Sequence, residues 1–161
     1  MSMIIDGTNG LTFNNATTQA SAGKVLQVVN GSTTTSASTT NSTYIDSGLT
    51  ATITPKFSTS KILVLVSQNG LGKTSGNISN DMTIQLVRGS TVIATPAAQT
   101  LNTGTTIVLY GYSASISYLD SPATTSATTY KTQFNNSNGT TAVIVQRTND
   151  TSTITLLEIA A

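Results

Sequence analysis

The fold of this chain is decided by residues 49–66, which read LTATITPKFSTSKILVLV. In the first part, from Leu49 to Thr54, apolar residues alternate with threonines, and this period of two is typical of a strand with one buried face. Threonine suits the exposed face because its β-branched side chain favours extended backbone while its hydroxyl remains hydrated. The last part, Ile62 to Val66, is apolar at every position. It predicts a strand covered on both faces, either in the middle of a sandwich or beneath a neighbouring subunit.

The same alternation recurs along the chain, at residues 82–86, 108–118 and 130–134. Residues 154–159 form a second block that is apolar on both sides, apart from Glu158. No segment sustains the 3.6-residue period of an amphipathic helix. We therefore predict an all-β fold of about eight to ten strands, an antiparallel β-sandwich that is jelly-roll-like.

Turn signals separate the strand-like blocks. Asn138-Gly139 predicts a hairpin that joins the strand containing Tyr130 to the apolar block after it. Arg88-Gly89-Ser90 predicts another turn, and Asn30-Gly31 and Asn69-Gly70 indicate further ones.

The first part of the chain differs from the rest, which predicts two units. In residues 1–23, isolated apolar residues stand among Gly, Asn and Thr, and we expect an extended attachment arm anchored by Ile4, Ile5, Leu11 and Phe13. Residues 24–161 then form the sandwich domain. Within it, the Ser/Thr-rich residues 32–42 predict a solvated loop or an edge strand.

The composition leaves little material for catalysis. The 161 residues include seven basic and six acidic side chains, a net charge of +1, and no His, Cys or Trp, while Thr, Ser and Asn make up about two-fifths of the chain. Common proton-transfer and metal sites use His, Cys or clustered carboxylates. The acidic residues are widely spaced along the sequence, so we predict no enzyme, no cofactor and no metal site, although an ion on a symmetry axis stays open.

The charges and apolar runs also bear on partners and compartment. The basic residues form no cluster and do not interleave with aromatics, so nucleic-acid binding is not expected. The longest apolar run, Ile62 to Val66, is too short to cross a bilayer, so no membrane insertion is expected. The first seven residues lack the basic and apolar regions of a secretory signal peptide, which predicts synthesis in a cytoplasm.

Residues 67–74 read SQNGLGKT and follow an apolar strand, as a phosphate-binding P-loop does. The P-loop pattern requires Gly where Ser67 stands and a helix that begins at the lysine. Here the following Ser75-Gly76-Asn77 disfavours a helix, and without a helix N-terminus the segment lacks the free N–H groups that hold phosphate. We therefore expect a loop between strands and no nucleotide site.

The candidate core or subunit-interface residues all lie in the apolar and alternating blocks. They are Ile62, Val64, Val66, Tyr110, Tyr112, Ile116, Tyr118, Leu156, Leu157 and Ile159. The three tyrosines could instead form a platform on which sugars stack, as in lectins. Because they share their parity with Ile116, packing in the core or at an interface is the preferred interpretation.

Several stretches, in the order of the chain, resemble a recurring β-domain of tailed-bacteriophage virion proteins. These are KVLQVV (24–29), DSGLTATITP (46–55), SKILVLV (60–66), SYLDSPATTSATTY (117–130) and STITLLEI (152–159). The leading GLTFNNATTQASA (10–22) is similar to the segment that introduces such domains in fibre proteins. Those proteins more often carry Pro-Asp-Gly where residues 14–16 read Asn-Asn-Ala here.

The resemblance implies a virion-surface domain that forms a homotrimer, is assembled in the host cytoplasm and becomes part of the virion. Two roles are compatible with it: a capsid decoration or cement protein whose arm binds the major capsid protein or other virion proteins, and a short fibre or fibre tip that contacts a host surface receptor. Decoration is preferred because the chain contains no heptad or collagen-like shaft. A lectin-like carbohydrate-binding module is a third, unrelated alternative.

Overall fold

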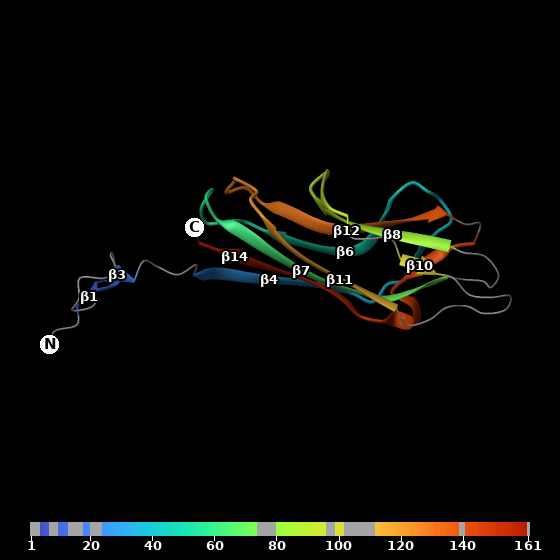
Figure 1. The fold of residues 1–161 in the computed structure, drawn as a ribbon, viewed down its shortest axis with the longest axis horizontal. Helices are drawn as coiled ribbons and strands as arrows, with labels where there is room; N and C mark the ends of the chain where they lie inside the picture. Colours follow the sequence, from blue (N-terminus) through green and yellow to red (C-terminus); the bar gives the residue numbers. More distant parts are fainter. Residues whose placement is uncertain are drawn as a thin grey trace.

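Two antiparallel sheets pack face to face in a sandwich (Figure 1). The computed structural model describes residues 4–6, 10–12, 18–19, 24–73, 80–95, 99–101, 112–138 and 141–160. Within these residues the chain forms fourteen strands and one short 3-10 helix, and no α-helix. The predicted all-β sandwich is confirmed.

The first sheet has six strands. Its four main strands, in order across the sheet, are β4 (Val25–Thr33), β14 (Ser152–Ile159), β7 (Lys61–Lys73) and β11 (Tyr112–Asp120). Beside the far end of β7 lie two short strands, β13 (Val143–Val145) and β5 (Ala37–Thr39). The 3-10 helix η1 (Arg147–Asn149) separates β13 from β14. The position of β5 at the sheet edge fits the predicted edge strand within residues 32–42.

The second sheet has five strands. Its members are β6 (Ile45–Ile53), β12 (Thr128–Asn138), β8 (Asn80–Arg88), β9 (Thr91–Ala94) and β10 (Gln99–Leu101). Both β9 and β10 pair with β8, which in turn pairs with β12. The chain crosses between the sheets from β5 to β6, from β6 to β7, from β7 to β8, from β10 to β11, from β11 to β12 and from β12 to β13. This strand order is jelly-roll-like, as predicted.

The N-terminal segment contains a small sheet of its own. Its strands are β1 (Ile4–Asp6), β2 (Gly10–Thr12) and β3 (Thr18–Gln19), paired in that order. Ile4 and Ile5 therefore lie in β1 and Leu11 in β2, while Phe13 lies outside the described residues. The segment is thus not the plain extended arm that we expected, because Ile5 pairs with Leu11 in a hairpin. Its role in attachment stays a prediction.

The hydrophobic core lies between the two sheets and follows the predicted alternation. Inward-facing residues of β6, β7, β8, β12 and β14 are almost fully buried, among them Leu49, Ile53, Ile62, Val64, Leu86, Tyr130, Phe134, Ile154 and Leu156. Apolar burial of this kind contributes about 25 cal/mol per Å² and is the main force that holds the two layers together.

Two predicted turns have different outcomes. The turn at Arg88-Gly89-Ser90 is confirmed, since it joins the paired strands β8 and β9 and Gly89 adopts a φ of 58°. The hairpin at Asn138-Gly139 is wrong. Strand β12 pairs with β6 and β8, whereas β13 pairs with β5 and β7, so the connection crosses from one sheet to the other. An Asn-Gly pair marks a local change of direction and does not determine which strands pair.

Two further Asn-Gly pairs lie inside strands, so the turns predicted there are wrong. Gly31 lies within β4, where a Cβ atom would stand 2.1 Å from the backbone oxygen of Thr50 in β6. Gly70 lies within β7 at a φ of 63°, where a Cβ atom would stand 2.5 Å from the backbone nitrogen of Arg147. Both glycines therefore permit a close approach between segments distant in sequence.

The segment that resembles a P-loop is not the loop that we expected. Residues 67–73 continue β7, and Gly72 and Lys73 pair with β13. Lys73 itself is the last residue of β7, and residues 74–79 lie outside the described residues.

Candidate functional site

Asp120, the one acidic residue of β11, joins the two sheets. Both carboxylate oxygens of Asp120 lie within 2.9 Å of Arg88 Nη1, at the end of β8. The Tyr130 hydroxyl, on β12, donates a hydrogen bond of 2.7 Å to the same carboxylate. Burial, together with this hydrogen bond, raises the pKa of Tyr130 well above its ordinary value of 10.0. The three side chains thus form a structural link between the layers.

A second acidic residue is fully buried at the same end of the sandwich, since Asp120 and Glu158 both pair with Ile62 of β7. Glu158, on β14, accepts hydrogen bonds from the Gln27 side-chain amide at 2.6 Å and from the Lys56 backbone N–H at 2.7 Å. The Phe57 backbone N–H lies 3.4 Å from the same carboxylate. Burial alone would raise the pKa of Glu158, but these hydrogen bonds outweigh it and lower the pKa. The carboxylate holds the connection between β6 and β7 against the first sheet.

A chain of buried polar side chains also crosses the interior. The Ser47 and Thr132 hydroxyls lie 2.5 Å apart, and Thr132 donates to Gln68 Oε1 at 2.8 Å. The Gln68 amide then donates to Ser152 Oγ at 3.2 Å. These four residues come from β6, β12, β7 and β14 in turn, so the chain links both sheets. Each member is buried and bonded, as buried polar groups must be to avoid a desolvation cost.

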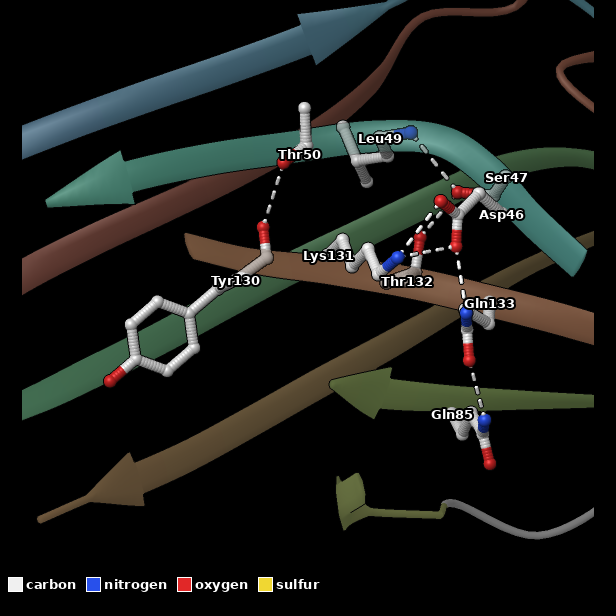
Figure 2. A network of polar contacts seen from close by, with 9 residues as sticks. All are labelled: Asp46, Ser47, Leu49, Thr50, Gln85, Tyr130, Lys131, Thr132 and Gln133. Carbon is white, nitrogen blue, oxygen red and sulfur yellow. Dashed lines mark hydrogen bonds and ion pairs between the residues drawn. The ribbon is translucent and has the colours of Figure 1, made fainter. Parts of the chain in front are cut away.

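The outer face of the five-stranded sheet is a ladder of polar side chains (Figure 2). Lys131 Nζ lies 2.8 Å from Asp46 Oδ1, and the Gln133 amide donates to the same carboxylate at 2.7 Å. The Gln85 amide donates to Gln133 Oε1 at 2.8 Å, which extends the ladder from β6 across β12 to β8. Burial would raise the pKa of Asp46, but hydrogen bonds from Lys131 and Gln133 lower it. The Asp46 and Lys131 end of the ladder is partly exposed to water, whereas Gln85 at its other end is buried.

The outer face of the six-stranded sheet is different in character. Its four main strands place one apolar side chain each in a single row, formed by Val28, Leu157, Leu63 and Leu119. We call these four residues the apolar row. Val28 and Leu119 are about half exposed, at 59% and 49%. Among the described residues, seven large hydrophobic side chains are exposed, and five of them lie on β4, β7 or β11 of this sheet. These five are Val25, Val28, Leu65, Tyr112 and Leu119.

The predicted core or interface residues divide into three groups. Ile62, Val64, Val66, Ile116 and Leu156 are buried between the sheets, and Tyr118 packs partly buried against them. Leu157 and Ile159 are half-buried on β14, whose alternate residues are buried in the core. Tyr112 is exposed, because a register irregularity between Tyr112 and Ala114 interrupts the alternation of β11. It is not a core residue of the single chain, and Tyr110 lies outside the described residues.

Sequence reasoning missed Val28 and Leu119 as surface residues. Leu63 and Leu65 lay inside the run that was apolar on both sides, so the sequence did contain a signal for them. Val28 and Leu119 lacked such a signal, because their alignment with Leu63 depends on the register of β4 and β11.

Two shallow surface hollows bring together no pair of acidic side chains. One lies beside Gly70 and contains the single carboxylate of Asp150, and the other lies beside the β8–β9 turn and contains Arg88. Among the described residues there is no group of three His, Cys, Asp or Glu side chains placed to hold a metal ion. The same residues include no helix long and apolar enough to span a membrane.

A scan of known protein families finds none that matches the chain. A search of curated proteins likewise finds no significant match.

Proposed function

We propose that this chain is a non-enzymatic structural protein of a tailed-bacteriophage virion, a trimeric capsid decoration protein attached through its N-terminal segment. The observation that carries the proposal is the contrast between the two outer faces of the sandwich. One face is a satisfied polar ladder from Asp46 to Gln85, and the other carries the apolar row. A subunit of an assembly needs both, because one side meets neighbours and the other meets water.

The placement of the buried acidic residues also supports a structural role. Asp120 is bonded to Arg88 and Tyr130, and Glu158 to Gln27 and the backbone of Lys56. A general acid or base must reach the proton that it transfers. These two carboxylates instead hold strands and connections together.

The resemblance to phage virion domains supports the proposed location, and imaging of the virion tests it. We expect cryo-electron microscopy of the phage that encodes the chain to place its sandwich on the capsid shell. Density for the chain at the tip of a tail fibre would replace the decoration role by the receptor-binding role. Absence of the chain from purified virions would overturn the whole proposal.

Attachment through the N-terminal segment has its own test. A variant that lacks residues 1–22 and the full chain are each mixed with capsids depleted of this protein. We expect the full chain to bind and the truncated chain to remain folded but unbound, with circular dichroism as the check on folding. Saturation of the capsids by the truncated chain would show that the anchor lies elsewhere.

A further inference from the structure

The apolar row belongs to a regular grid on the outer face of the six-stranded sheet. Strand pairing places Leu157 between Val28 and Leu63, and Leu63 opposite Leu119. On one side of the row Ile159 pairs with Val25 and Lys61, and on the other side Thr155 pairs with Asn30 and Leu65. The next step along the strands aligns only hydroxyl residues, which are Ser32, Thr153, Ser67 and Ser115. The face therefore changes from apolar to hydroxyl-rich along the strand direction.

The grid, formed by the outward-facing residues of β4, β14, β7 and β11, is large for a surface that no other protein covers. With strands about 4.8 Å apart and residues about 3.3 Å apart, four strands of seven residues cover roughly 440 Å² of flat area. Side-chain relief increases the accessible area, so two such faces together approach the roughly 1,000 Å² of a specific interface. Leu65 is 40% exposed and lies next to the row, so the apolar region is continuous.

Charge is almost absent from this grid. Lys61 is its one ionisable residue, and it lies at the apolar end, where its long side chain can reach water past the rim. A different protein partner is usually selected by complementary charges, and the grid offers no such pattern. A second copy of this chain carries the same uncharged rows. With a net charge of +1 per chain, copies repel each other little.

We infer that copies of this chain meet one another through this face, around a symmetry axis that runs along the strands. A rotation about such an axis keeps every row at its own height. The apolar row of one copy then faces the apolar rows of its neighbours, and hydroxyl rows face hydroxyl rows. This assignment rests on the proposed function, because that function requires a trimer, and it names the surface through which the trimer forms.

The test is the mass of the full chain in solution, measured by light scattering after size-exclusion chromatography over a range of concentrations. The variant Val28→Lys/Leu119→Lys places two charges in the row at half-exposed positions, so the core is untouched. We expect the unchanged chain to have three times the monomer mass of 16.6 kDa. We expect the double variant to be monomeric, with self-association at least ~100-fold weaker, because like charges would face each other around the axis.

Val92→Lys is the matched control, because Val92 is 47% exposed and lies on β9 of the other sheet. We expect it to retain the mass of the unchanged chain. If circular dichroism shows that the double lysine variant is unfolded, Val28→Thr/Leu119→Thr takes its place, since threonine favours strands.

Three results would overturn the inference: an unchanged chain that is monomeric, a folded double variant that keeps the oligomeric mass, or a control that dissociates as readily as the double variant. A monomeric chain that binds capsids through Val28 and Leu119 would overturn the inference and assign the face to another virion protein; the decoration role would stand, but its trimeric form and its attachment through the N-terminal segment would not. Conversely, an oligomer that depends on this face but is absent from virions would leave the inference intact and remove the proposed function.

Discussion

At the scale of single residues, Glu158 shows how a charge can serve the fold. Its carboxylate is fully buried and accepts hydrogen bonds from the Gln27 amide and the Lys56 N–H. A buried carboxylate without partners would carry a large desolvation cost, and here the donors offset it. The sequence reading treated Glu158 as the exception in an apolar block. In the structure it faces inward, in line with Ile154 and Leu156.

Replacing this residue gives a pH-dependent prediction. In Glu158→Gln one oxygen becomes an NH₂ group that faces donors, so we expect a loss of about 1.5–3 kcal/mol of unfolding free energy at pH 7. The pKa of Glu158 is lowered in the folded state from its ordinary 4.5, so the unfolded state takes up the proton first as the pH falls. The stability that the charge contributes is present above pH 4.5 and is lost below it.

Urea unfolding of the unchanged chain and of Glu158→Gln, at pH 7 and at pH 3, measures this contribution. The difference in unfolding free energy between the two proteins should shrink at the lower pH. The control is Asp150→Asn at an exposed position, where we expect a change within about 0.5 kcal/mol. A difference that stays constant between the two pH values would contradict the role assigned to the charge.

At the scale of strands, the buried polar chain from Ser47 to Ser152 determines how the two sheets align. Apolar side chains alone tolerate small shifts of one layer over the other, because their contacts have no fixed direction. Hydrogen bonds between Thr132 and Gln68 do have a direction, and they connect β12 of one sheet with β7 of the other. Such a fully bonded network favours one arrangement of the layers.

The variant Thr132→Val tests this network, since it replaces the hydroxyl by a methyl group at nearly constant volume. Ser47 and Gln68 would each lose a buried partner, and we expect the unfolding free energy to fall by about 1–3 kcal/mol. Thr52→Val is the matched control, because the Thr52 hydroxyl bonds to Thr129 on the exposed face. We expect the control to change stability by less than about 0.5 kcal/mol in denaturant titrations. Equal losses of unfolding free energy in the two variants would show that the buried hydrogen bonds of Thr132 contribute no more to stability than the exposed one of Thr52.

At the scale of the whole molecule, stability depends on apolar burial and on neutral hydrogen bonds. The chain carries few charges, and two ion pairs between described residues are Arg88–Asp120 and Lys131–Asp46. The first of these is largely buried, where salt screens it little. Because few ion pairs contribute to its stability, we expect the fold to be insensitive to changes in salt concentration.

We therefore expect the thermal midpoint of unfolding to change little between 0.05 and 1 M NaCl. A change below about 4 °C corresponds to roughly 1 kcal/mol in a chain of this size. Differential scanning calorimetry at several salt concentrations measures it. A larger fall with rising salt would show that surface charges hold the sandwich together.

The sequence by itself determined the fold class and most of the core. Alternation from Leu49 to Ile53 and the apolar run from Ile62 to Val66 specify which residues turn inward, because side chains of a strand alternate between its two faces. The inward-facing positions depend only on residues that are neighbours in the chain, so they can be predicted from the sequence. The absence of a helical period is local in the same way.

The tertiary structure alone decided which strands pair and what lies on each outer face. Asn138-Gly139 does not close a hairpin, and Gly31 and Gly70 lie in strands because distant backbone approaches them closely. The apolar row exists only because the registers of β4, β14, β7 and β11 align Val28 with Leu119, which lie 91 positions apart in the chain. Strand pairing and register depend on contacts between segments that are distant in sequence, so they cannot be predicted from a local sequence pattern.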